Sequence, residues 1–143
     1  MDAEEKKAYL RRYRVLSRRI DQTKIEIANW GDIATRVTPQ YVDTPKGGGT
    51  ADKVQNAAVE IAQLEEELEK LKMDAISEQN QIKQILSSLE NDNLRDLLWY
   101  HYICGLEWTE VAEKMHYDLH YLYALHRQAI KLLDIPETSY QIS

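Results

Sequence analysis

The sequence predicts an all-α protein, in which a long antiparallel coiled-coil hairpin of helices precedes a smaller helical domain. Three observations lead to this prediction. Apolar residues recur at alternating spacings of three and four in two long stretches, which is the heptad pattern of helices that pack along a seam. The segment between these stretches holds four of the five glycines and two of the three prolines. Two short amphipathic patterns then follow near the C-terminal end.

The first predicted helix spans about residues 4–30, and its seam runs from Tyr9 to Trp30. Gly31 is expected to end this helix, because glycine readily adopts the left-handed conformation of a C-terminal cap. Residues 31–50 are expected to form a loop. The seam consists of Tyr9, Tyr13, Leu16, Ile20, Thr23, Ile27 and Trp30.

The second predicted helix spans about residues 52–90, and Glu78 interrupts its seam. Arg12 and Arg19 flank the first seam and acidic residues flank the second, so an antiparallel arrangement brings opposite charges together. These acidic residues are Glu60, Glu67 and Asp74. The second seam consists of Val54, Ala57, Ile61, Leu64, Leu68, Leu71, Ala75, Ile82, Ile85 and Leu89.

The first helix is too short to cover the second helix beyond Glu78. The apolar residues of that uncovered stretch must pack on the C-terminal domain or on another subunit. We therefore expect a homo-oligomer, with this stretch as its interface. The interface residues would be Ile82, Ile85, Leu86 and Leu89.

A domain boundary is expected at residue 90, which separates the hairpin of residues 1–90 from a C-terminal domain of residues 91–143. Asn91 and the two residues after it should end the long helix and cap the next one. That next helix is apolar and should run to Gly105.

Two short helices should follow, joined by a tight turn. The first keeps Val111 and Ala112 on one face, and the chain then breaks at His116 and Tyr117. Asp118 is a good N-cap for the last helix. Two short helices joined in this way form a helix-turn-helix unit, whose second helix can enter the major groove of DNA. The core side of the last helix consists of Leu122, Leu125 and Ala129.

The apolar, aromatic and small residues of this region are Leu97, Leu98, Tyr102, Trp108, Val111, Ala112, Met115, Tyr117, Leu122, Leu125, His126 and Ala129. Their order resembles region four of bacterial sigma factors. It is more closely similar to the ArpU/RinA-like transcriptional regulators of phages and prophages of Gram-positive bacteria, as are the upstream Gly47–Gly49 and Val54–Gln55. The resemblance implies binding to double-stranded DNA and regulation of phage or prophage genes. It also implies that the helices beginning at Trp108 and Asp118 are the scaffold and recognition helices.

The expected DNA-binding surface lies on the last helix, opposite its core side. Arg127 is expected to contact a phosphate or a guanine edge. The expected contact residues are Leu119, His120, Tyr121, Tyr123, Ala124 and Arg127, with Lys114 and Lys131 beside the backbone. The basic stretch of the first helix, from Lys6 to Lys24, could add phosphate contacts. These contacts would come from Arg11, Arg14 and Arg18.

The charge distribution keeps two other functions open. The net charge is −6, and residues 91–143 hold four Lys or Arg against eight Asp or Glu, whereas DNA-binding domains usually carry a basic footprint. The exposed tyrosines could instead bind RNA polymerase, a repressor or a defence protein, because tyrosine is enriched at the cores of protein interfaces. A small DNA-packaging (terminase) subunit also joins such elements, usually in the reverse order.

No enzymatic activity, metal or cofactor is expected. The sequence lacks a glycine-rich loop after a strand and a nucleophile elbow. Its histidines and its one cysteine lack the paired spacing of zinc ligands. We expect Cys104 to be a small buried residue. No apolar run approaches the roughly 20 residues of a membrane span, and the single cysteine suits a reducing compartment. A cytoplasmic protein of a bacterial host cell is expected. The histidines and the cysteine that could bind a metal by residue type are His101, Cys104, His116, His120 and His126.

Overall fold

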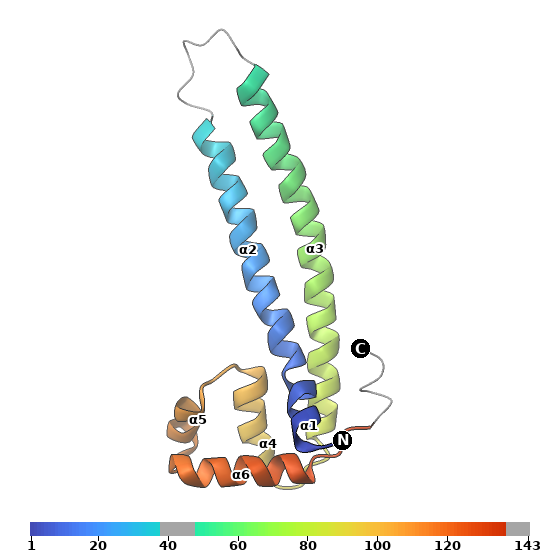
Figure 1. Cartoon of the computed structure of the whole chain (residues 1–143), viewed down its shortest axis with the longest axis vertical. Helices are drawn as coiled ribbons and strands as arrows, with labels where there is room; N and C mark the ends of the chain where they lie inside the picture. Colours follow the sequence, from blue (N-terminus) through green and yellow to red (C-terminus); the bar gives the residue numbers. More distant parts are fainter. Residues whose placement is uncertain (38–47, 137–143) are drawn as a thin grey trace. The chain divides into compact units, whose positions relative to one another are not determined.

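The computed structural model describes residues 1–37 and 48–136, and these ranges contain helices and no strand. The prediction of an all-α protein is confirmed for this part of the chain (Figure 1). No helix in the described ranges has both the length and the apolar character that crossing a membrane requires.

The chain forms two compact units, which do not divide at residue 90. The first unit combines Met1–Val15 with Ala75–Ser143, and the second is Leu16–Asp74. The N-terminal segment therefore belongs with the C-terminal half of the chain. We call these the globular unit and the helical-pair unit.

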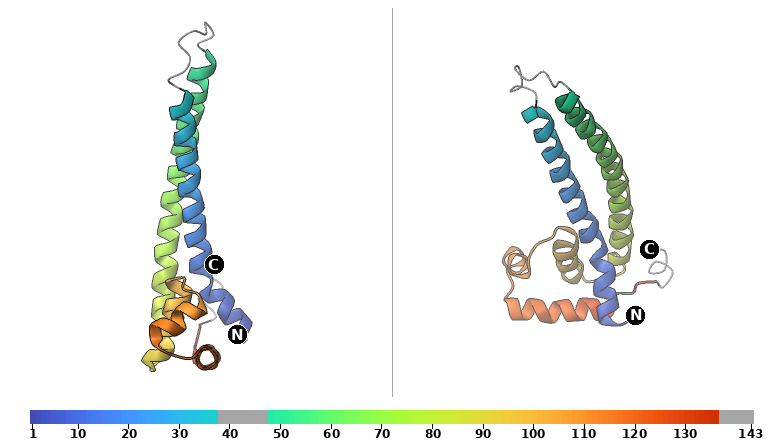
Figure 2. Two further views of the ribbon diagram at one scale, coloured as in Figure 1. Left: turned by 90° about the vertical axis from the view of Figure 1, so that its left-hand side faces the viewer. Right: turned by 45° about the horizontal axis from the view of Figure 1, so that its top comes forward.

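The helical-pair unit consists of most of α2 (Arg12–Val37) and α3 (Gly48–Leu86). Within this unit the two helices run side by side in opposite directions (Figures 1 and 2). The Arg19 guanidinium lies 4.0 Å from the Glu67 carboxylate, which confirms the expected complementarity of charge at this pair. Both side chains are more than half exposed, so the pair stabilises the unit only slightly. The buried side chains of the unit are Thr23, Ala57, Leu64 and Leu71.

The ends of these helices differ from the predicted ones. Gly31 does not end α2, which continues to Val37. Gly31 has no positive φ, so it is an ordinary helical residue. A glycine inside a helix costs only about 1 kcal/mol relative to alanine, which the rest of the helix tolerates. The second helix begins at Gly48, four residues before the expected start, and ends at Leu86. The central part of the predicted loop, residues 38–47, lies outside the described residues.

The globular unit is built around one hydrophobic core. In it α6 (Leu119–Leu132) packs against α1 (Ala3–Leu10), α4 (Asp92–Leu98) and α5 (Trp108–Met115). Both ends of the chain contribute to this core. Its largest fully buried side chains are Tyr9, Leu10, Ile82, Leu86, Leu94, Leu97, Leu98, Tyr102, Val111, Leu122, Ile130 and Leu133.

The first predicted helix is in fact two helices, because the chain bends at Arg11 between α1 and α2. Tyr9 and Leu10 are fully buried in the core of the globular unit, and this burial fixes the direction of α1. The Arg12 guanidinium lies 2.6 Å from the Glu78 carboxylate, inside the same unit. This ion pair explains why an acidic residue interrupts the second apolar seam.

The predicted oligomer interface is part of the core. Ile82, Ile85, Leu86 and Leu89 are at most 7% exposed and pack against the other core residues of the globular unit. Of the two alternatives drawn from the sequence, packing on the chain's own C-terminal domain is therefore the one observed. These side chains are not left uncovered, so they give no argument for an oligomer.

The cap at the start of α4 was predicted correctly, whereas the end of this helix was not. Asn91 caps α4 as expected, and its side chain accepts a hydrogen bond from the Leu94 backbone N–H at 3.3 Å. The apolar segment that follows is not one α-helix, because α4 ends at Leu98 and a π-helical turn, η1 (Trp99–Ile103), takes over. Gly105 has φ +75°, a value that suits glycine at the end of this segment.

Candidate nucleic-acid interface

A short turn joins α5 and α6 at the predicted place. His116 adopts the left-handed conformation with φ 60°, and the Tyr117 backbone N–H donates to the Ala112 carbonyl at 2.9 Å. Asp118 caps α6, since its carboxylate accepts a hydrogen bond from the His120 backbone N–H at 3.2 Å. These three local features fix where α6 begins.

The surface of α6 divides into a core side and a solvent side as its helical period predicts. Leu122 and Ala129 are fully buried, and Leu125 packs against the core. Among the expected DNA contacts, Leu119 differs from the rest because it is half-buried against the core. The exposed ones are Lys114, His120, Tyr121, Tyr123, Ala124, Arg127 and Lys131.

Ring contacts hold the two exposed tyrosines in place. The Tyr121 ring lies edge-to-face against Tyr117 at a centroid distance of 5.2 Å. The Tyr123 ring lies edge-to-face against Trp108 at 6.4 Å. Tyr121 is 53% exposed and Tyr123 is 37% exposed, so both remain available to a partner. Their ring contacts restrict the side chains before anything binds, which lowers the entropic cost of binding.

A cluster of four rings lies next to this surface, and we call it the histidine cluster: His101, Tyr102, Trp108 and His126. The His101 ring stacks on Trp108 with centroids 3.8 Å apart and planes inclined by 17°. The His126 ring lies 4.4 Å from the Trp108 ring. The Tyr102 hydroxyl and His126 Nε2 share a hydrogen bond of 2.9 Å. The cluster therefore joins η1, α5 and α6.

Burial keeps the histidine cluster uncharged at neutral pH. Desolvation lowers the pKa of His126 to about 4, and the nearby positive charge of Lys7 lowers it further. Desolvation also lowers the pKa of His101, although Nδ1 donates a hydrogen bond to the Leu106 carbonyl at 2.8 Å. Desolvation raises the pKa of Tyr102 to about 12. The hydrogen bond between Tyr102 and His126 therefore joins two neutral groups.

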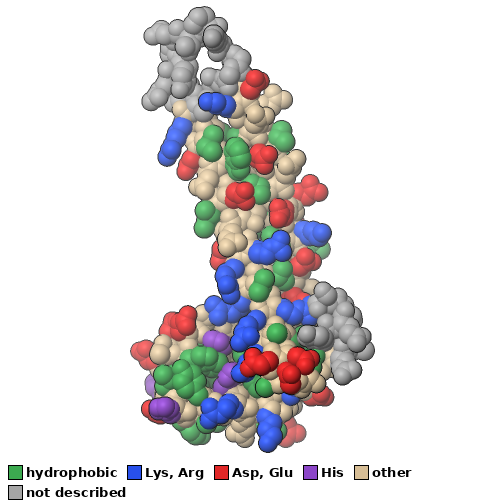
Figure 3. Space-filling model, in the orientation of Figure 1, with side chains coloured by type: hydrophobic (Ala, Val, Ile, Leu, Met, Phe, Trp, Pro, Cys, Tyr) green, Lys and Arg blue, Asp and Glu red, His purple; other side chains and the backbone are tan. Residues whose placement is uncertain are grey.

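Cations gather around the histidine cluster from both ends of the chain. Lys7, Arg11 and Arg127 oppose protonation of His126, and Arg11 and Arg14 oppose protonation of His101. The Arg14 guanidinium also covers Gly105, where a Cβ would lie 3.6 Å from Nε. Figure 3 shows Lys and Arg side chains beside histidines on this face of the globular unit. We call this set the basic row: Lys7, Arg11, Arg14 and Arg127.

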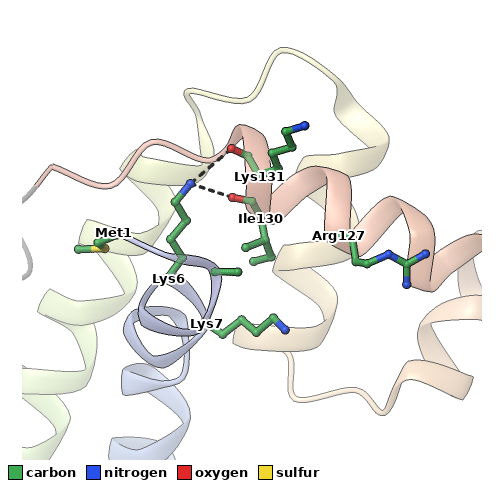
Figure 4. Close-up of a pocket in the computed structure, with 7 residues that line it drawn as sticks. Met1, Lys6, Lys7, Arg127, Ile130 and Lys131 are labelled. Atoms are coloured by element: carbon green, nitrogen blue, oxygen red, sulfur yellow. Dashed lines mark hydrogen bonds between the residues drawn. The ribbon is translucent and has the colours of Figure 1, made fainter.

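A pocket of about 440 Å³ lies between α1 and α6 at one end of the basic row (Figure 4). Lys6 Nζ donates to the Ile130 carbonyl at 3.0 Å, so Lys6 caps the C-terminal end of α6. In this view the Lys7 side chain extends along the side of α6 on which Arg127 lies, whereas Lys131 ends on the other side. No carboxylate is among the lining residues, which are Met1, Ala3, Lys6, Lys7, Arg127, Ile130 and Lys131.

The structure brings most of the predicted phosphate contacts together but not all of them. Arg11 and Arg14 lie in the globular unit with α6, whereas Arg18 belongs to the helical-pair unit. Lys7 was not among the phosphate contacts predicted from the sequence. Its spacing of four and seven residues from Arg11 and Arg14 is a signal that could have found it.

The metal candidates do not form a metal site. Within the described ranges, no group of three or more His, Cys, Asp or Glu is placed to hold an ion. His101 and His126 pack in the histidine cluster instead. Cys104 is exposed, so the expectation that it is a buried apolar residue is wrong. It lies just after η1, where the chain turns toward Gly105.

Comparison with known proteins gives a family match. Residues 36–134 match the model of the family described as "Protein of unknown function (DUF1492)". No curated protein and no solved structure matches the chain. The matched range includes α3 through α6, and therefore the exposed side of α6, whereas α1 lies before it.

Proposed function

We propose that the chain, which belongs to the DUF1492 family through residues 36–134, more than half of its length, binds double-stranded DNA and regulates transcription of phage or prophage genes. In this proposal α5 and α6 form a helix-turn-helix unit like that of sigma region four and of the ArpU/RinA-like regulators. The second helix, α6, enters the major groove.

One observation carries the proposal most: the composition of the exposed side of α6. This side presents hydroxyl and imidazole groups at His120, Tyr121 and Tyr123, a methyl group at Ala124 and a guanidinium at Arg127. The major groove is wide enough for an α-helix, and its base edges offer hydrogen-bonding groups and the thymine methyl. The hydroxyl, imidazole and methyl groups have matching partners on these base edges, and the guanidinium matches a guanine edge or a phosphate. The opposite side of α6 is committed to the core.

The composition of the globular unit weakens the electrostatic argument against DNA. Residues 91–143 are acidic, but residues 1–15 hold five Lys or Arg against three Asp or Glu and belong to the same unit. Affinity for DNA depends on local cations that displace counterions from the phosphates, more than on the net charge of the chain. The basic row supplies such cations next to α6.

A gel-shift assay tests the proposal. The probes are a duplex from the DNA flanking the protein's own gene and a mixed-sequence duplex of equal length, each at about 50 and about 200 mM salt. We expect retardation of both duplexes at low salt and of the flanking duplex alone at higher salt. We also expect that Arg127→Ala abolishes the complex with the flanking duplex. The matched change Lys83→Ala in α3 should leave that complex intact. No retardation at low salt would reject the proposal.

Protein binding is the second candidate, and the acidic side of α5 favours it. Glu107 at the N-cap of α5 and Glu110 and Glu113 within it are exposed, and the Trp108 ring of the same helix contacts Tyr123 of α6. Exposed tyrosines together with exposed carboxylates suit a basic protein partner, such as a region of RNA polymerase, a repressor or a defence protein. Loss of such a partner on Tyr121→Ala, in a protein that does not retard DNA, would favour this candidate.

The helical-pair unit has a supporting role in the proposal. Its two apolar seams support packing as an antiparallel coiled coil, and a homo-oligomer would raise avidity for repeated half-sites. The interface of that oligomer would lie outside the stretch from Ile82 to Leu89, which the core buries. Exposed apolar side chains of this unit are available instead, and they are Ile25, Ile33, Val59 and Met73.

A further inference from the structure

We infer that the basic row is a clamp for the DNA backbone, in which cations from the N-terminal segment and from α6 bind consecutive phosphates of one strand. The N-terminal half of α6 is then left to read the bases. This inference rests on the proposed function and extends it, because it assigns affinity and sequence preference to different residues.

The N-terminal part of the row is a line of charges. Lys7, Arg11 and Arg14 are spaced by four and three residues, which places their side chains on one face of a helix. The bend at Arg11 does not break this spacing, because the Arg11 N–H still donates to the Lys7 carbonyl at 3.0 Å and the Val15 N–H to the Arg11 carbonyl at 3.2 Å. A line of cations matches the regular array of phosphates along a strand.

Arg127 extends the row from α6. It lines the same pocket as Lys7, and both charges act on His126. The other cations of the pocket contribute less to the row. Lys6 donates to the carbonyls at the end of α6, and Lys131 ends on the far side of the helix in Figure 4. Arg127 is thus placed for a phosphate, which narrows its two expected roles to one.

Most charges of the row are available to a ligand. In the described part of the chain Arg11, Arg14 and Arg127 form no ion pair, whereas Arg12 and Arg95 do. Lys7 is the exception in the row.

The acidic groups near the row leave it open to a phosphate. Lys7 lies 3.3 Å from Glu4, but the Glu4 side chain is 77% exposed, so this pair is weak enough for a phosphate to replace it. Glu107, the N-cap residue of α5, acts on His101. His101 and His126 are neutral, so they add no charge that would compete with the row for a phosphate.

Base reading falls to the first turns of α6. Residues 119–124 include no Lys or Arg, so the bidentate arginine–guanine contact is absent from this stretch. The groups present are the imidazole of His120, the hydroxyls of Tyr121 and Tyr123, and the methyl of Ala124. Recognition helices contact base edges mainly through their N-terminal residues. The row and these residues should therefore be separable by mutation.

The test is the salt dependence of binding to a mixed-sequence duplex of about 30 base pairs, measured by fluorescence anisotropy between about 50 and about 200 mM salt. The test variant is Lys7→Gln/Arg11→Gln/Arg14→Gln. Its control, Lys24→Gln/Lys53→Gln/Lys70→Gln, removes three exposed cations from the helical-pair unit and so matches the change in net charge.

We expect the slope of log affinity against log salt to become shallower by about 2–3 in the test variant. The control should keep the wild-type slope. Circular dichroism establishes that each variant is folded. If the triple variant does not fold, Lys7→Gln/Arg127→Gln replaces it, with an expected change in slope of about 2.

The outcomes separate the clamp from the proposed function. Binding by the wild type with an unchanged slope in the folded test variant overturns the clamp and leaves DNA binding intact. Absence of binding by the wild type at the lowest salt overturns both. Tyr121→Ala should retain the wild-type slope on this duplex. If its slope becomes as shallow as that of the triple variant, the assignment of affinity and of base reading to different residues is overturned.

Discussion

The Tyr102 hydroxyl lies 2.9 Å from His126 Nε2, and this hydrogen bond ties η1 to α6 beside the proposed DNA-binding surface. Tyr102 is buried and His126 is partly buried, so the bond lies within the packed part of the globular unit. Because the imidazole is neutral there, the position of α6 depends on a group that acid can charge.

We predict that acid destabilises the protein through His126. Its pKa is about 4 when folded, against an ordinary value near 6.5, so the unfolded chain binds the proton more tightly. The stabilisation from the neutral ring is complete at pH 7 and is lost as the pH falls from about 6.5 toward 4. The loss is at most about 3 kcal/mol. Urea unfolding at several pH values should show that the free energy of unfolding falls less with acid in His126→Gln than in the wild type. Equal losses in the two proteins would contradict the prediction.

The ion pair of Arg12 and Glu78 should be sensitive to the loss of one partner. Arg12 Nη1 and Glu78 Oε2 are buried without a hydrogen-bond partner, so each charge depends on the other. Glu78→Ala should lower the free energy of unfolding by about 3–5 kcal/mol. The double change Arg12→Met/Glu78→Met should cost less than the sum of the single changes, because no charge is left buried. Additive losses, measured by urea unfolding, would refute this coupling.

His116 is strained, and glycine should relieve the strain. The residue has φ 60° at the end of α5, a conformation that costs side chains with a Cβ about 1–2 kcal/mol. Relief of this strain by His116→Gly should raise the free energy of unfolding by about 1 kcal/mol. The greater entropy of glycine in the unfolded chain offsets part of this gain. His116→Ala is the matched control and should give no such gain. A stabilisation by alanine as large as that by glycine would show that strain is not the cause.

Ile82 distinguishes a core residue from an interface residue. The side chain is fully buried in the globular unit, so Ile82→Asp should unfold that unit at any protein concentration. Met73→Asp, which changes an exposed residue of α3, should leave the fold intact. Circular dichroism and sedimentation equilibrium measure the two effects. A folded Ile82→Asp protein that only dissociates would restore the oligomer interface first drawn from the sequence.

Features that depend on neighbouring residues were predictable. The division of α6 into core and exposed sides follows from the helical period, and the cap at Asp118 follows from the residue type. The seams of the two long helices were visible for the same reason. Gly31 was misread because glycine favours a helix end without requiring one.

Features that depend on distant parts of the chain were not predictable. The bend at Arg11 arises because Tyr9 is buried in the core, near Gln81, which is 72 positions away. The pairing of the N-terminal segment with α6 joins Lys6 to Ile130 across 124 positions. The spacing of the basic row was present in the sequence, but nothing local indicated that it would lie beside α6.

The measurement that tests the central claim most directly is affinity cleavage of DNA from the exposed side of α6. In a Cys104→Ser background, Ala124→Cys carries an iron–EDTA reagent, and Gln63→Cys in the helical-pair unit carries it as the control. Both positions are exposed, so attachment disturbs no core packing. The account predicts strand cleavage at a few adjacent nucleotides by the Ala124→Cys protein and a different or absent pattern from the control. A retarded complex in which the Ala124→Cys protein leaves the DNA uncut would contradict the claim that α6 lies in the groove.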